Sequence, residues 1–278
     1  MSKLDLIYGP DCILSQFYGK EPLRTLYEKF DDIFENKILN EEKLESIDNK
    51  ILNTCRKLYM FHMAGLMSLK TEKEISIKQN RECIFLIWED EINLLYNLES
   101  MILFSRSALD LGAYIFSILL LEPYGNCRKD SFNDFSKELL KSENQNLKPL
   151  KEKLQELEKD NLSWYRLLCG TRGRALRDKI SHQTILAVDY FKTESSGDKE
   201  YCHVVVDKSV IPIEDFIKNI SFGVFEFFFL AEELIIKTWS DVEKNSWALP
   251  DLPNSMSRIE INPTILYEVK YESNEFKI

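Results

Sequence analysis

The chain has 278 residues, a formal net charge of −10 and 44% hydrophobic residues, with only 9 glycines and 8 prolines. This composition can bury a sizeable core, and it excludes an intrinsically disordered protein. The acidic balance excludes a protein whose whole surface binds nucleic acid or an anionic membrane, although it is compatible with a local basic site on an acidic body.

Helical patterning begins near the N-terminus. Residues 22–39 and 41–69 carry apolar side chains three and four positions apart, which predicts helices there, and a weak break follows at 70–73. No proline occurs between residues 75 and 121, where the same spacing continues. This stretch predicts one long helix, or two helices joined at a kink, ending at the turn-forming "EPYGN" of residues 122–126.

Shorter helices are predicted in the middle of the chain. Residues 131–159 have helical spacing, and Pro149 predicts a break or a kink within them. Residues 161–170 predict a short helix that a glycine stops. A further helix is expected for "RALRDKISH", residues 174–182.

After these helices the pattern changes to that of β-structure. The β-rich runs at 184–192 and 201–207 flank the turn-forming "TESSGD", which predicts a β-hairpin over residues 184–207. Residues 212–239 predict a long apolar final helix, and residues 264–272 suggest one more strand. The chain is therefore predicted to be mainly α, a helical bundle with a β-hairpin inserted before the last core helix.

Two apolar stretches resemble membrane segments in composition. Residues 111–121 are only eleven long, and residues 222–236 are interrupted by Glu226, Glu232 and Glu233. Because a membrane span requires about 20 apolar residues, both stretches are predicted to be core helices, and no membrane association is expected.

The six cysteines lie far apart in the sequence and form no CxxC pair, and the first residues contain no apolar signal-peptide region. We therefore expect a cytoplasmic protein with reduced thiols. Cys202 and His203 are adjacent but lack nearby ligand partners, so neither a metal nor a cofactor is expected.

Basic residues gather around one of the three histidines. Guanidinium groups suit phosphate because they stay charged and offer a bidentate fork, and histidine exchanges protons near neutral pH. Metal-independent RNA cleavage needs such a base for the 2′-hydroxyl proton and a cation near the phosphate. Between residues 166 and 182 the basic residues are Arg166, Arg172, Arg174, Arg177 and Lys179, the single acid is Asp178, and the histidine is His182.

The spacing of this group leaves its geometry open. On one ideal helix Arg177 and His182 lie about 140° apart, whereas Arg174, Asp178 and His182 share a face. A catalytic pair would require the helix to end near residue 181, or a second subunit. A structural interpretation stays open as well, because a histidine at a helix C-terminus is favourable by itself, Asp178 can pair with Arg174, and an arginine-rich patch can hold an acidic protein.

The "RDKISH" sequence resembles the Arg–polar–x3–His motif of the HEPN superfamily (higher eukaryotes and prokaryotes nucleotide-binding domains). The stretch "RSALDLGAYIF", residues 106–116, resembles the helix that often pairs with the motif helix in bacterial members. The resemblance implies a HEPN-like antiparallel helical bundle at residues 76–240 that commonly dimerises. An N-terminal helical segment, residues 1–75, would pack on this core, and residues 241–278 would form a tail.

The resemblance also implies roles for the basic group. Arg177 would stabilise the scissile phosphate, His182 would act as acid and base, and Asp178 would hold both in place. The hairpin after His182 departs from the simplest four-helix form of the family, which puts the shape of the site in doubt. The residues expected to bind the substrate are Arg172, Arg174, Lys179 and Arg166.

Two acidic residues are expected to support this site. Asp110 is four residues from Arg106 in an apolar helix, so it forms an intrahelical ion pair or reaches the motif helix to orient Arg177 or His182. Glu226 stands in the apolar run "FGVFEFFF", where a buried carboxylate needs a partner. An arginine of the motif helix is one expected partner, and a solvent-facing Glu226 is the alternative.

The first functional hypothesis is a metal-independent endoribonuclease of HEPN type, acting as a homodimer in a toxin or antiviral defence setting with an antitoxin or defence partner. The second is a catalytically inactive HEPN-like module that binds nucleotide, RNA or a protein. A plain scaffold is a third hypothesis, because one fold hosts many functions.

Overall fold

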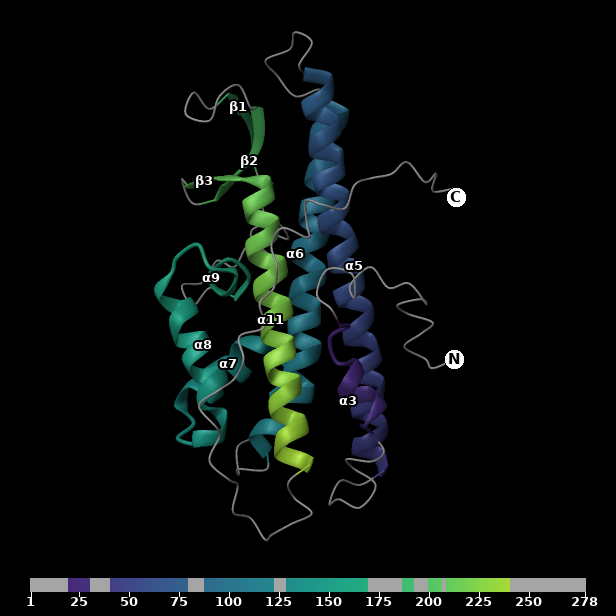
Figure 1. Ribbon diagram of the computed structural model, residues 1–278, viewed down its shortest axis with the longest axis vertical. Coiled ribbons are helices and arrows are strands. Elements are labelled where there is room, and N and C mark those ends of the chain that lie inside the picture. The colour runs from purple at the N-terminus through teal and green to yellow at the C-terminus, as the bar shows by residue number, and fades with distance from the viewer. Residues whose placement is uncertain are drawn as a thin grey trace.

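The computed structural model describes residues 20–30, 41–79, 88–122, 129–169, 187–192, 200–206 and 209–240. Within these ranges the protein is mainly α, as the sequence predicts. Three long helices lie side by side and form the body of the molecule, and several of the short helices lie on one flank of it (Figure 1). The long helices are α5 (Glu41–Gln79), α6 (Trp88–Phe116) and α11 (Ile213–Ser240).

Helices α5 and α6 form a long helical pair, but α5 does not end where the sequence pattern predicts a break. The predicted break at residues 70–73 is wrong, because α5 continues without interruption to Gln79. Residues 70–73 are lysine, threonine and glutamate, and the Lys70 ammonium lies 4.0 Å from the Glu74 carboxylate one turn later. Neither proline nor glycine is present to end the helix there.

Helix α6 continues into a π-helical turn, η1 (Ser117–Leu121), whose five residues are all buried. Among the described residues, the stretch Glu89–Leu121 is long and apolar enough to cross a membrane by length and composition. Most of its apolar window, 67%, is buried inside the fold, where α6 packs against α5 and α11. This environment is the one expected for the core helix of a bundle.

Three short helices form the flank of the bundle. They are α7 (Phe132–Lys141), α8 (Lys148–Lys159) and α9 (Trp164–Cys169). Pro149 lies in the first turn of α8, directly after the 3₁₀ turn η3 (Gln145–Leu147). The proline therefore begins a helix instead of kinking one, because its missing N–H group needs no partner in a first turn.

The predicted hairpin is confirmed and gains a third strand. Strands β1 (Ala187–Lys192) and β2 (Glu200–Val206) pair antiparallel, and β3 (Ser209–Pro212) pairs with the other edge of β2. The last residue of β3 leads directly into α11, so the sheet lies at the N-terminal end of that helix (Figure 1). The strand predicted for residues 264–272 lies outside the described residues.

A short N-terminal segment is attached to the bundle through a buried carboxylate. Glu232 of α11 accepts hydrogen bonds from the backbone N–H groups of Leu23 and Leu26, at 3.1 and 2.9 Å. These groups belong to the N-cap residue and to the first turn of α3 (Arg24–Glu28), whose N-cap residue makes no side-chain capping bond. Glu232 thus caps α3 from a distant helix, and the Leu23 backbone beside it is left-handed, with φ of 62°.

Burial lowers the pKa of His62 in α5 to about 3, and its ring makes an edge contact with Phe225. The unfolded chain gains a proton at this position below pH 6.5, whereas the folded chain does not until about pH 3. The His62 contribution to stability is therefore complete above pH 6.5 and is lost progressively as the pH falls toward 3, by about 1.4 kcal/mol per unit.

We expect His62→Leu to gain stability relative to the wild type as the pH falls from 6.5 to 4.5. Urea unfolding of both proteins across this range measures the difference. Burial raises the pKa of Glu72 to about 7 and of Glu232 to about 6, which stabilises the fold on acidification, so only the difference between variant and wild type isolates His62. A difference that does not change with pH would contradict a neutral, buried His62.

Candidate functional site

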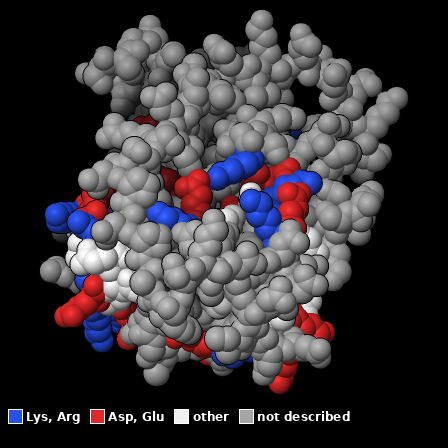
Figure 2. Space-filling model, turned by 60° about the horizontal axis from the view of Figure 1, so that its bottom comes forward, with Lys and Arg blue, Asp and Glu red and all other residues white. Residues whose placement is uncertain are grey.

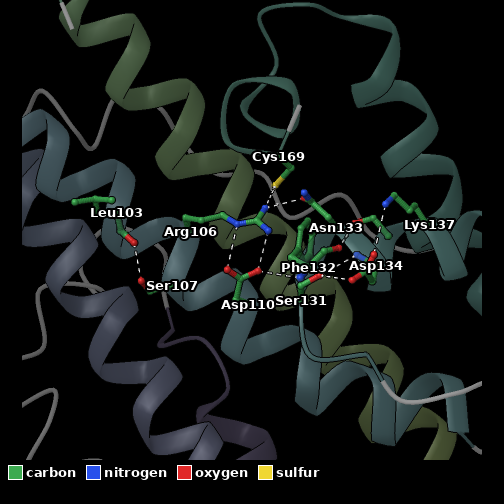
Figure 3. Close-up of polar contacts among 11 residues, drawn as sticks. Leu103, Arg106, Ser107, Asp110, Ser131, Phe132, Asn133, Asp134, Lys137 and Cys169 are labelled. Atoms are coloured by element: carbon green, nitrogen blue, oxygen red, sulfur yellow. Dashed lines mark hydrogen bonds and ion pairs between the residues drawn. The ribbon is translucent and has the colours of Figure 1, made fainter. Parts of the chain in front are cut away.

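A buried arginine organises the polar contacts between α6 and the flanking helices. The side chain of Arg106 is 4% exposed. Its Nη2 and Nε atoms donate to the two oxygens of Asp110, one turn later in α6, at 2.8 and 3.2 Å (Figure 3). The four-residue spacing noted in the sequence therefore produces an intrahelical, bidentate ion pair.

The remaining terminal nitrogen of Arg106 reaches two other helices. Nη1 donates to Oδ1 of Asn133 in α7 at 2.9 Å and to Sγ of Cys169, the last residue of α9, at 3.0 Å. Oδ1 of Asp110 also accepts the backbone N–H of Phe132, the first residue of α7, at 2.9 Å. One buried guanidinium and its carboxylate thus join α6, the start of α7 and the end of α9 (Figure 3).

The start of α7 is shaped to present Asn133 to this cluster. Ser131 is the N-cap residue, and its hydroxyl accepts the backbone N–H of Asp134 at 3.2 Å. The same hydroxyl donates to the Asp134 carboxylate at 2.9 Å, which lowers the pKa of that carboxyl. The cap and the bond from the Phe132 N–H to Asp110 both fix the backbone of this first turn, in which Asn133 accepts from Arg106.

All three predicted catalytic residues, and three of the four predicted substrate-binding residues, lie outside the described residues. Residues 170–186 lie between the described residues Cys169 and Ala187. The roles proposed for the intervening side chains therefore stay predictions, and the residues concerned are Arg172, Arg174, Arg177, Asp178, Lys179 and His182.

Arg166 is the one member of the predicted basic group that the structure describes. It lies in α9 and is partly buried, and its Nε donates to the backbone carbonyl of Glu158 near the end of α8, at 2.8 Å. This bond orients the guanidinium along the junction between α8 and α9. The contact gives Arg166 a structural role beside the substrate-binding role predicted for it.

Glu226 pairs with a lysine of a neighbouring helix. Its carboxylate lies 2.9 Å from the ammonium of Lys153 in α8, and its side chain is 42% exposed. Glu226 is thus a half-exposed residue of α11 that pairs with a lysine of α8, and the arginines of the motif lie outside the described residues. A pair so exposed contributes little to stability.

The charge of the described surface is mixed. Figure 2 shows one end of the molecule, where basic and acidic side chains alternate and none of the coloured residues forms a large patch of one sign. Among the described residues there is also no group of three His, Cys, Asp or Glu side chains placed to hold a metal ion.

The sequence reasoning missed two members of the Arg106 cluster, Asn133 and Cys169. Neither residue type is distinctive in its position, since asparagine is common in first turns and the cysteine belongs to no pair. A usable signal was Arg106 itself, because an arginine in an otherwise apolar core helix needs more acceptors than one carboxylate provides.

In comparisons with protein-family models, curated proteins and solved structures, no significant match to this chain was found.

Proposed function

We propose that the protein is a metal-independent endoribonuclease of HEPN type. The observation that carries the proposal is the placement of the Arg106 cluster. A buried ion pair of α6, in the stretch that resembles the partner helix of the family, contacts Cys169, which lies eight positions before the first residue of the "RDKISH" motif. Burying a guanidinium costs free energy of folding, so its presence at this point supports a role in positioning the chain segment that follows α9.

In the proposed reaction His182 removes the proton of a 2′-hydroxyl group, and the 2′-oxygen attacks the adjacent phosphorus. Arg177 stabilises the charge that gathers on the non-bridging phosphate oxygens. The bond from phosphorus to the 5′-oxygen breaks, and that oxygen takes up a proton. The products are a 2′,3′-cyclic phosphate and a 5′-hydroxyl. Asp178 would hold the two catalytic side chains, and Arg172, Arg174, Lys179 and Arg166 would bind the RNA.

We expect the purified protein to cleave single-stranded RNA in the presence of EDTA. His182→Ala should abolish cleavage, and Arg177→Ala should lower it by on the order of a hundredfold or more, as the loss of one transition-state contact predicts. Arg56→Ala is the matched control, because it removes the same charge from an exposed position of α5. Intact RNA after incubation with the wild type, or equal cleavage by the wild type and His182→Ala, would contradict the proposal.

The net charge of −10 favours a second candidate, an inactive HEPN-like module that holds nucleotide, RNA or an acidic protein on the basic segment. Fluorescence anisotropy with a short labelled RNA separates the two candidates. Binding that Arg177→Ala weakens, without any cleavage, is the result that this module predicts.

The oligomeric state, the location and the biological system are also proposals. We propose a cytoplasmic homodimer with a HEPN-like helical bundle at residues 76–240, in a toxin or antiviral defence system with an antitoxin or defence partner. A dimer would bring two motif segments to one cleft. Light scattering on the purified protein measures the oligomeric state.

A further inference from the structure

The contact between Arg106 and Cys169 joins the core of the bundle to the end of a very short helix. Helix α9 has six residues, too few to be stable alone. Its first residues, Trp164 and Tyr165, are held by aromatic contacts with Phe132, at centroid separations of 6.2 and 6.3 Å. Its last residue, Cys169, accepts a hydrogen bond from Arg106 Nη1 at its sulfur.

The ion pair between Arg106 and Asp110 does not require the bond from Arg106 to Cys169. Asp110 takes the Nε and Nη2 groups of Arg106, which leaves Nη1 available for another helix. That nitrogen is shared between Asn133 and the Cys169 sulfur, both on the flank of the bundle. Because the guanidinium is rigid and is clamped on one side by Asp110, its other side defines a fixed position for the sulfur.

We propose that Arg106 and Cys169 are positioning residues, which fix the point where the chain leaves α9 toward the arginine-rich segment of residues 172–182. Only residues 170 and 171 separate Cys169 from this segment, so a displacement of Cys169 would also displace the start of the segment. A test of this role by RNA cleavage rests on the proposed ribonuclease function, whereas a test by hydrogen–deuterium exchange does not.

The first test is the rate of RNA cleavage under saturating and limiting substrate. Cys169→Ala should lower kcat by on the order of tenfold to a hundredfold, as expected for a misplaced catalytic group, with KM close to that of the wild type because the basic side chains are unchanged. Cys169→Ser should restore most of kcat, because its hydroxyl can accept the Nη1 hydrogen. The matched control is Cys55→Ala, a buried cysteine of α5 whose thiol donates to the Pro22 carbonyl, and it should leave kcat unchanged.

The second test does not depend on cleavage. In hydrogen–deuterium exchange, amides of residues 170–186 should exchange about fivefold to tenfold faster in Cys169→Ala than in the wild type, as the loss of one hydrogen bond predicts. Exchange in α5 should not change, and Cys169→Ser should resemble the wild type.

If the wild type does not cut RNA, the ribonuclease proposal is lost and exchange alone decides the positioning role. Three results would overturn that role. They are equal exchange in Cys169→Ala and the wild type, exchange of residues 170–186 that is already unprotected in the wild type, and a serine variant that behaves like the alanine variant.

Discussion

Asp110→Ala is expected to destabilise the protein by about 3 kcal/mol. The substitution removes the bidentate partner of Arg106 and leaves a guanidinium, whose side chain is 4% exposed, without its compensating charge. It also removes the acceptor of the Phe132 N–H at the start of α7. Breaking a buried ion pair from one side costs about 3–5 kcal/mol, and the 28% exposure of the Asp110 side chain places this case at the lower end.

Urea unfolding followed by circular dichroism measures the effect. Asp110→Asn should cost less, because an amide oxygen still accepts one of the bonds. The matched control is Asp134→Ala, which removes the same charge from the exposed first turn of α7 and should cost less than about 1 kcal/mol. Equal stability of Asp110→Ala and Asp134→Ala would contradict a buried, essential pair with Arg106.

Gly223→Ala is expected to destabilise the fold by at least about 2 kcal/mol, although alanine is the better helix former. A Cβ atom at position 223 of α11 would lie 1.8 Å from Cδ1 of Trp164. The indole cannot move aside easily, because it is 1% exposed and packs against Phe227 and Phe132, at centroid separations of 5.8 and 6.2 Å. Either the ring or the helix must shift, and both belong to the packed core.

Gly65→Ala is the matched control for this prediction. It makes the same change within α5, where the nearest atoms to the added Cβ lie at 3.4 and 3.5 Å, in the side chains of Ile217 and Met101. We expect it to be neutral or mildly stabilising, since alanine gains up to about 1 kcal/mol of helix propensity over glycine. Near-UV circular dichroism should change for Gly223→Ala, which displaces Trp164, and not for Gly65→Ala. Two variants of equal stability would show that α9 and α11 are not in close contact.

Local features of the chain account for most of the correct fold predictions. The final helix and the hairpin were placed to within a few residues, because apolar spacing and turn residues act over short distances. The break predicted near Pro149 is confirmed, because α7 ends at Lys141 and α8 begins at Lys148. The error came where local signals conflicted: the polar run of lysine and glutamate at residues 70–73 suggested a break, although these residues are good helix formers.

The candidate site was less predictable than the fold, for a physical reason. The pairing of Arg106 with Asp110 follows from their four-residue spacing alone, and the structure bears it out. The partners Asn133 and Cys169 lie 27 and 63 residues away from Arg106, and no local pattern encodes such distances. The same holds for Glu226, whose partner Lys153 is 73 residues away in the neighbouring α8.

The sequence by itself determined the mainly α character of the protein, its long apolar core helices and the hairpin before the last of them. Each of these depends on interactions between residues a few positions apart. The tertiary structure decided which polar groups are buried and what compensates them. Glu232 caps a helix some 200 residues earlier, and Arg106 meets the end of α9, because burying a charge requires partners that only the packing of distant helices supplies.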